Sequence, residues 1–286
     1  LAAILTALVR PALPAAPLIA IDAPTRGSGK SLLVDVVSII ATGRSAVCVA
    51  QGKDETEDEK RLGSALLAGY GMISIDNLHS PLAGDFLCSL LTQSTVAVRV
   101  LGASQLLDLP TQVALFATGN NIQARGDMTR RSLLMQLDAG VERPELRVFK
   151  DPNLTGTVTR RRGELLVALF TILRGWQQAG MPGCGERLLG RFEGWSQAVA
   201  APLRWLGFPD PTDSQARLRA ADPEADKLEL FLTTWFDLRG GQWTTATELI
   251  SEAEPANDFS PTRSTHREAL AEALLDVAPD GRGRVS

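Results

Sequence analysis

Residues 18–31, which read LIAIDAPTRGSGKS, decide the fold of this chain. The apolar run at 18–21 is typical of a buried strand, and it ends at Asp22. A glycine-rich turn follows, and apolar side chains recur at helical spacing after Ser31. A strand, a glycine-rich turn and a helix in this order are the setting of a phosphate-binding loop, or P-loop.

The turn contains the residue types that phosphate binding needs. Gly27 and Gly29 allow backbone N–H groups to close around phosphate oxygens, and the N-terminus of the following helix adds a favourable field. Lys30 would reach the β- and γ-phosphates of ATP, and the Ser31 hydroxyl would ligate Mg²⁺. The predicted nucleotide-binding residues are Pro24, Thr25, Arg26, Gly27, Ser28, Gly29, Lys30 and Ser31.

Pro24 stands where the usual pattern GxxxxGK[ST] has its first glycine. The alternative interpretation is therefore an ordinary glycine-rich turn with a solvated lysine. Lysine is scarce, because the 29 basic residues include only five lysines: Lys30, Lys53, Lys60, Lys150 and Lys227. This scarcity and the strand-to-helix setting favour phosphate binding.

Downstream of the P-loop, short apolar runs alternate with segments of helical spacing. Strands are predicted at 46–49, 72–75 and 113–117, and helices at 31–40, 57–67 and 82–91. Alternating strands and helices predict an α/β fold, with a parallel sheet covered by helices on both faces. The sequence thus predicts a P-loop NTPase sheet with flanking helices.

From about residue 151 the strand signals end. Five segments with helical spacing follow, separated by glycine and proline breakers, at 160–178, 192–206, 227–238, 245–254 and 265–277. We expect a P-loop ATPase domain at 1–150, a helical domain at 151–221 and a helical module at 222–286. A truncated winged helix is one interpretation of that last module.

The composition is that of an ordinary globular chain. Hydrophobic residues make up 44% and charged residues 22% of the 286 residues, which excludes a disordered tail and a disulfide-stapled miniprotein. The net charge of −4 excludes a polycation that coats nucleic acid, although residues 120–174 carry a local basic excess. The three cysteines and two histidines lack metal-ligand spacing, which argues against a structural zinc site.

The sequence also leads to expectations about the cellular compartment of the protein and about the length of the full polypeptide. No run of about 18 uncharged apolar residues occurs, so we predict no membrane span. Cysteines without a pairing pattern favour the cytoplasm. Because the sequence begins at Leu1 without a methionine, we expect a fragment of a longer polypeptide.

Asp76 follows the apolar run at 72–75, and a carboxylate there, beside the P-loop, would hold Mg²⁺ through water. Asn77 occupies the place where many P-loop ATPases have a glutamate that orients the attacking water. An amide cannot accept that proton, so a base must lie elsewhere or hydrolysis is slow. Glu57 is our candidate base, and a solvated helix start at 54–59 is the alternative interpretation.

Two further polar segments follow the strand at 113–117. Asn120 would hold the lytic water and sense the γ-phosphate, unless it belongs to an ordinary asparagine-rich turn. Arg130 and Arg131 are expected in the first turn of a helix, where a cation is mildly unfavourable, which weakens a purely structural explanation. An arginine offered to the γ-phosphate of a neighbouring subunit would stabilise transition-state charge, and that role needs an oligomer.

A β-hairpin interrupts the alternation at 96–109, where two apolar runs flank Gly102-Ala103-Ser104. An edge hairpin without further function is the simpler interpretation. Arg99 is the only basic residue in this segment, and its tip at 101–104 contains no lysine.

Taken together, these motifs resemble the AAA+/superfamily 3 helicase type of ATPase, and more closely the ATPase part of phage and prophage primase–helicase proteins. The resemblance covers roughly the first 150 residues. The stretches that carry it are 21–33, 76–77, 99–104, 117–121, 126–131 and 142–145.

The resemblance implies a ring-forming motor that hydrolyses ATP with Mg²⁺ and moves along single-stranded or forked DNA. In such proteins the hairpin grips the DNA backbone, and here Arg99 alone offers it charge. The residues 160–162, all arginine, are a second candidate DNA surface or a solvated helix start. The alternative function is an ATP-binding switch or scaffold that hydrolyses little and does not translocate. A P-loop kinase is disfavoured by Asn120 and the paired arginines.

Overall fold

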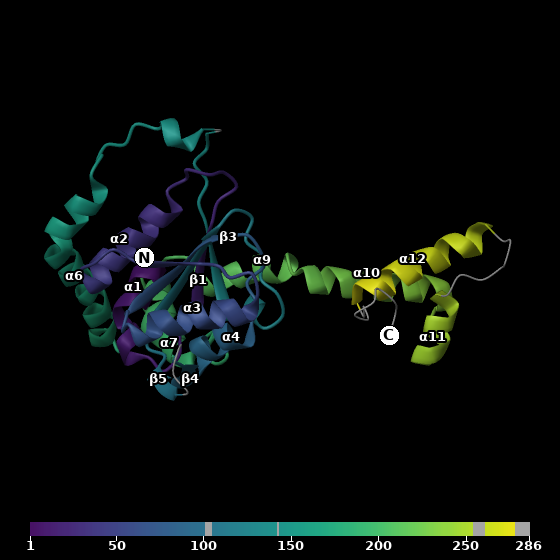
Figure 1. Ribbon diagram of the computed structural model, residues 1–286. Helices are drawn as coiled ribbons and strands as arrows, with labels where there is room; N and C mark the ends of the chain where they lie inside the picture. The colour runs from purple at the N-terminus through teal and green to yellow at the C-terminus, as the bar shows by residue number, and fades with distance from the viewer. Residues whose placement is uncertain (101–104, 142, 254–260, 278–286) are drawn as a thin grey trace. The chain divides into compact units, whose positions relative to one another are not determined.

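The structure, a computed structural model, describes residues 1–100, 105–141, 143–253 and 261–277. The chain divides into two compact units, Leu1–Ala220 and Ala221–Ser286 (Figure 1). None of the helices in the described ranges has the length and apolar character needed to cross a bilayer. The hairpin tip at 101–104 and Glu142, which the sequence analysis singled out, lie outside these ranges.

A five-stranded parallel sheet with the order β2-β3-β6-β1-β7 forms the centre of the first unit. Every residue of β1 and β6 is buried, because helices cover both faces of the sheet. The α/β class predicted from the sequence is confirmed. The strands are β1 (Leu18–Asp22), β2 (Val47–Ala50), β3 (Met72–Leu78), β6 (Ala114–Gly119) and β7 (Ser132–Gln136).

Alternate residues of β1 contribute to the cores on opposite faces of the sheet. Ile19 and Ile21 pack with apolar side chains of α1 (Ala2–Val9) and α2 (Lys30–Thr42). Leu18 and Ala20 belong to the larger core, which also contains apolar side chains of α3 (Glu55–Leu67) and α4 (Asp85–Thr92). The first strand is therefore fixed from both sides, and this fixes the starting point of the P-loop.

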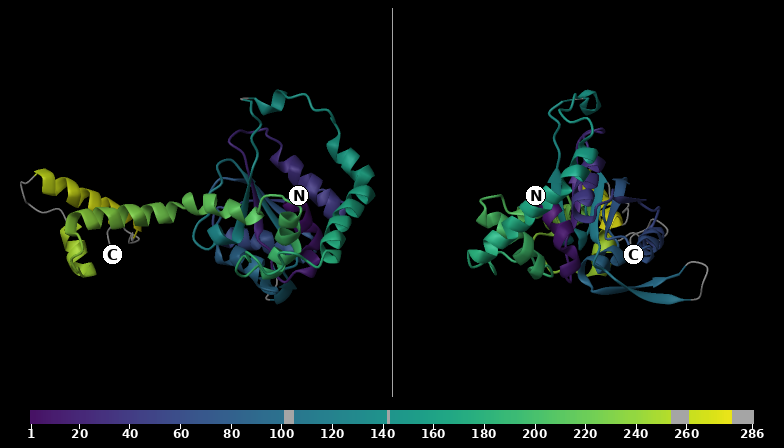
Figure 2. Two further views of the ribbon diagram at one scale, coloured as in Figure 1. Left: turned by 180° about the vertical axis from the view of Figure 1, so that it is seen from behind. Right: turned by 90° about the vertical axis from the view of Figure 1, so that its left-hand side faces the viewer.

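The predicted hairpin is present as a separate two-stranded antiparallel sheet, β4 (Thr95–Arg99) and β5 (Leu106–Pro110). It projects from the first unit in the right-hand view of Figure 2. Val98 packs closely on α3 at Gly63, where an added Cβ would lie 2.7 Å from a Val98 methyl group. The absence of a side chain at Gly63 therefore allows the hairpin to lie against α3.

The helical segment that follows β7 belongs to the same compact unit as the sheet. Its longest helix, α6 (Leu154–Gln178), packs along α2, and Arg162 donates hydrogen bonds to the carbonyls of Ile39 and Ile40, each at 3.0 Å. A cation at the C-terminus of α2 is favoured by the helix dipole. The shorter α-helices of this segment are α7 (Glu193–Trp195), α8 (Ala201–Trp205) and α9 (Gln215–Ala220), and a further short helix, α5 (Met128–Arg131), precedes β7.

Among the described residues of the second unit, the regular secondary structure is helical. It consists of α10 (Pro223–Arg239), α11 (Ala246–Ala253) and α12 (Pro261–Val277). A small apolar cluster of Leu249, Leu270 and Leu274 joins these helices, with Phe231 and Trp235 packed against it.

The N-terminal segment, for which the sequence predicted no element, is tied to the sheet by a buried arginine. Arg10 is 1% exposed and donates hydrogen bonds to the carbonyls of Val113 at 3.0 Å, Leu13 at 2.6 Å, and Thr111. Burial lowers the pKa of Arg10 to about 10. The guanidinium therefore stays charged at neutral pH, and it links the N-terminal segment to the start of β6.

We expect Arg10→Ala to lower the free energy of unfolding by about 3 kcal/mol, because buried carbonyls lose their donors. Urea denaturation of both proteins measures this difference. Arg160→Ala, at an exposed position of α6, is the matched control and should change stability by less than about 0.5 kcal/mol. Equal stability of the two variants would contradict the anchoring role of Arg10.

Candidate nucleotide-binding site

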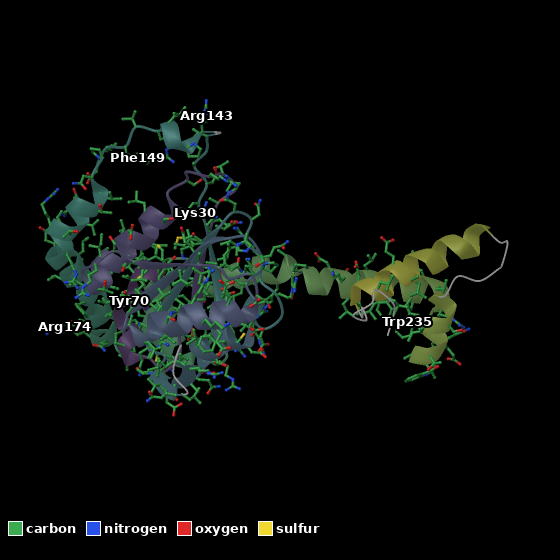
Figure 3. All side chains as sticks on the ribbon, viewed as in Figure 1. Lys30, Tyr70, Arg143, Phe149, Arg174 and Trp235 are labelled. Carbon is green, nitrogen blue, oxygen red and sulfur yellow. The ribbon has the colours of Figure 1, made fainter. Side chains whose placement is uncertain are left out.

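The predicted site residues come from neighbouring strands that end at one edge of the sheet. β1 leads through the P-loop into α2, β3 contains Asp76, and β6 leads into Asn120. Because β6 lies between β1 and β3, its tip is adjacent to both. Figure 3 labels Lys30 at the N-terminal end of α2, on this edge.

The backbone of the P-loop has the conformation that the glycines were expected to permit. Gly27 and Gly29 have φ values of +71° and +89°, in the left-handed region. Gly29 is the N-cap of α2, and no side chain among the described residues caps this helix end, so its first N–H groups are available to an anion. The Ser28 hydroxyl donates to the Thr25 carbonyl at 2.6 Å and holds the turn closed. Pro24 is exposed at its start.

Lys30 lies at the centre of the site. Its Nζ donates hydrogen bonds to Asn120 Oδ1 at 2.5 Å and to the Thr25 carbonyl at 3.4 Å. Partial burial lowers the pKa of Lys30, against the opposite effect of the nearby carboxylates of Asp22 and Asp76. The structure thus brings together the lysine of the P-loop and the predicted polar tip of β6.

The predicted metal-binding residues are also adjacent. The Ser31 hydroxyl donates to Asp76 Oδ1 at 3.1 Å, and the Thr118 hydroxyl donates to the same oxygen at 2.5 Å. Asn77, with a φ of +56°, donates its backbone N–H to Thr118 Oγ1 at 3.1 Å. The register between β3 and β6 shifts at this point, so Asp76 lies at an irregularity of the kind that re-aims a side chain.

These donor groups fit magnesium. Hydroxyl and carboxylate oxygens are the ligand types that Mg²⁺ prefers, and Ser31 and Asp76 provide one of each. Within the described part of the chain, no three histidine, cysteine, aspartate or glutamate side chains cluster to hold a metal unaided. A magnesium ion at this site would therefore take its remaining ligands from phosphate and water.

Two residues of the site carried no signal that the sequence analysis used. Thr118 precedes the tip of β6 by two residues and resembles any threonine in a strand. Asp22, the last residue of β1, is only 5% exposed, and its Oδ1 accepts the backbone N–H of Ile122 at 3.2 Å. The sequence signal that could have identified Thr118 and Asp22 is that each is a polar residue near the end of a buried strand.

Glu57, the candidate base, is engaged at the N-terminus of α3. Its carboxylate accepts the Lys53 N–H at 3.3 Å and pairs with Arg61 in an (i, i+4) ion pair. The Asp54 side chain in turn accepts the Glu57 N–H at 2.9 Å, which completes a reciprocal helix cap. These contacts lower the pKa of Glu57, the Lys53 hydrogen bond having the larger effect. The structure does not bring Glu57 into the hydrogen-bonded group around Lys30.

The two predicted arginines occupy different environments. α5 is a single turn with Asp127 at its N-cap, so Arg130 and Arg131 lie in its first turn, as expected, and this turn is also its last. Both arginines pair with Asp127, which offsets the unfavourable position of a cation there. The Arg131 side chain is 16% exposed and also donates to the Cys88 carbonyl at 3.0 Å. The Arg130 side chain is 62% exposed and extends into solvent.

The candidate DNA-binding arginines also differ in their exposure and in their hydrogen-bond partners. Arg99 is exposed at the end of β4. Arg160 and Arg161 are exposed on α6, where Arg161 pairs with Glu164 at 2.9 Å. Arg162, by contrast, is committed to the carbonyls at the C-terminus of α2.

No family model and no curated protein matches this chain. Among solved structures, it aligns with the A-form apo structure of the NrS-1 C-terminal region at 11% identity and a TM-score of 0.42, covering 96% of this chain and 59% of that one. The JCV helicase bound to an acetamide compound aligns at 12% identity and a TM-score of 0.31, covering 82% of this chain and 62% of that one. The chain thus spans about three fifths of these structures. Similarity at this level defines neither the fold nor the function of the chain.

The left-handed conformation of Gly29 leads to a stability prediction. An alanine at this position would meet no atom within 4 Å, so its cost would come from the backbone conformation alone. We expect Gly29→Ala to lower the free energy of unfolding by about 1–2 kcal/mol. In Gly190→Ala, a matched control with equal space and no positive φ, the change should stay within about 0.5 kcal/mol. Chemical denaturation compares the two variants, and equal losses would argue against the P-loop conformation.

Proposed function

We propose that this chain is the ATPase part of an AAA+/superfamily 3-type motor, which hydrolyses ATP with Mg²⁺ and acts on DNA in phage or prophage replication. The convergence of Lys30, Ser31, Asp76 and Asn120 at one edge of the sheet carries this proposal. A cation, a hydroxyl, a carboxylate and an amide there match the needs of phosphoryl transfer, where positioning and charge stabilisation do most of the catalysis. The cytoplasm is the proposed compartment.

The residues divide the reaction between them. The N-terminal N–H groups of α2 and the ammonium group of Lys30 bind the phosphates. Lys30 exchanges the Asn120 carbonyl for a phosphate oxygen, and the freed Asn120 amide orients the attacking water. The water oxygen bonds to the γ-phosphorus as the bond to the leaving ADP oxygen breaks, and the proton of the water passes to a γ-phosphate oxygen. Ser31 and Asp76 would hold Mg²⁺, which when bound would supply positive charge to offset the negative charge of the phosphates. Thr118 keeps the Asp76 carboxylate aligned with Ser31.

The motor function requires a ring of copies and contact with DNA. Arg130 is the better of the two arginines to reach the site of a neighbouring copy, because its side chain extends into solvent. The β4–β5 hairpin projects from the unit and presents Arg99 to a single-stranded or forked DNA backbone. These two surfaces support a homo-oligomeric ring that encloses DNA.

An ATP-binding switch or scaffold is the second candidate function. It is favoured by Asn77, which supplies no carboxylate, and by Glu57, whose carboxylate serves as a helix cap and ion-pair partner. A switch would bind ATP tightly and turn it over slowly with or without single-stranded DNA. Stimulation of turnover by that DNA supports the motor instead.

We expect Lys30→Ala to reduce ATP turnover about 100-fold or more and to weaken ATP binding, because it removes the ammonium group that contacts Asn120 at the P-loop. A phosphate-release assay and equilibrium titration with a fluorescent ATP analogue measure both effects. Lys60→Ala removes an exposed lysine of α3 and should behave as the wild type. Unchanged turnover in Lys30→Ala would remove the P-loop assignment.

The two arginines give a separate prediction. Arg130→Ala should lose turnover by about 1,000-fold or more with little change in stability, whereas Arg131→Ala should lose about 1 kcal/mol or more of stability. Mixing Arg130→Ala with Lys30→Ala subunits should restore turnover, since each copy then supplies what the other lacks. A mixture as inactive as its components would exclude an arginine acting between subunits.

A further inference from the structure

Asp22 is a nearly buried carboxylate next to the P-loop. It ends β1, two residues before Pro24, and is 5% exposed. A carboxylate withdrawn from water is costly unless hydrogen bonds and opposite charge compensate. Asp22 has both, because its Oδ1 accepts the Ile122 N–H at 3.2 Å and its charge favours the cationic form of Lys30.

The backbone amide of Ile122 belongs to residues 120–122, which directly follow β6 and are called the β6 tip here. Asn121, with a φ of +54°, turns the chain back between Asn120 and Ile122. The turn is tightly packed, since a Cβ on Gly119 would lie 2.8 Å from Ile122 Cγ1 and 3.2 Å from Leu78 Cβ. The position of Asn120 therefore depends on how Ile122 is held.

Asp22 precedes the glycine-rich part of the P-loop and Lys30 follows it. Both contact the β6 tip, Asp22 at Ile122 and Lys30 at Asn120. Asp22 accepts from Ile122, and Lys30 donates to Asn120 at 2.5 Å. The P-loop strand and the β6 tip are thus joined at two points. The Asp22 contact is the buried one, while the Lys30 contact is the one that a bound phosphate would displace.

We propose that Asp22 is a positioning residue, whose hydrogen bond to Ile122 holds the β6 tip in place so that the Asn120 amide keeps facing the γ-phosphate when Lys30 turns to it. This inference rests on the proposed ATPase function. Asp22 contacts neither substrate nor water in this role. A charge-only role, in which the carboxylate acts on Lys30 without the Ile122 contact, is the competing explanation.

Two substitutions separate these explanations. Asp22→Ala removes both the hydrogen bond and the charge, and we expect kcat for ATP to fall about 10- to 100-fold with KM changed by less than about threefold. Asp22→Asn keeps an acceptor oxygen and loses the charge, so it should retain kcat within about threefold of the wild type. Should Asp22→Ala not fold, Asp22→Ser takes its place, because its hydroxyl is too short to reach the amide.

A double-mutant cycle with Asn120→Ala tests whether Asp22 acts through Asn120. We expect Asp22→Ala to have little further effect on kcat once Asn120 is gone. Hydrogen exchange of the Ile122 amide, which needs no ATP, should speed up in Asp22→Ala and stay slow in Asp22→Asn.

Three results would overturn the proposal: wild-type kcat in folded Asp22→Ala, equal impairment in Asp22→Asn and Asp22→Ala, or additive effects in the cycle. Failure of the ATPase function itself is recognised separately, since wild-type turnover would then be absent or unaffected by Lys30→Ala.

Discussion

The hydrogen bond from Lys30 Nζ to Asn120 Oδ1 joins two segments that lie 90 residues apart in the sequence. It forms because β6 lies between β1 and β3, which makes the tip of β6 adjacent to both the P-loop and Asp76. From the same strand, Thr118 aligns the Asp76 carboxylate. One buried strand, fixed by apolar cores on both faces of the sheet, therefore places both the proposed phosphate-binding side and the proposed metal-binding side of the site.

The parts of the site that could be predicted have local signals. Lys30 follows a glycine-rich turn, and Asp76 and Asn120 follow apolar runs. The carboxyl ends of parallel strands meet at one edge of the sheet. Thr118 and Asp22 also stand at the ends of apolar runs, but their roles depend on which strands are neighbours, and the sequence does not show this. Asp22 accepts a hydrogen bond from Ile122, which lies 100 residues away in the sequence, and the residues around either position do not predict this contact.

The partners of the arginine side chains were also not predictable from the sequence. Sequence reasoning treats an arginine as a phosphate ligand or a solvated charge, yet Arg10, Arg131 and Arg162 all donate to backbone carbonyls. Two of these contacts span more than 100 residues, from Arg10 to Val113 and from Arg162 to Ile39. Only the tertiary fold distinguishes these structural arginines from Arg130, which extends into solvent. The order of the βα units was predictable from the sequence, whereas the hydrogen-bond partners of the arginine side chains were not.

The central claim is that Lys30, Ser31 and Asp76 form one site for a nucleotide and its metal ion. The most direct test is a crystal structure with a non-hydrolysable ATP analogue and Mn²⁺, whose anomalous scattering locates the ion. We expect the anomalous peak beside Ser31 Oγ and the Asp76 carboxylate, with Lys30 Nζ moved from Asn120 to a phosphate oxygen. A nucleotide bound elsewhere, or a P-loop that leaves Lys30 on Asn120 with no ion beside Asp76, would contradict the claim.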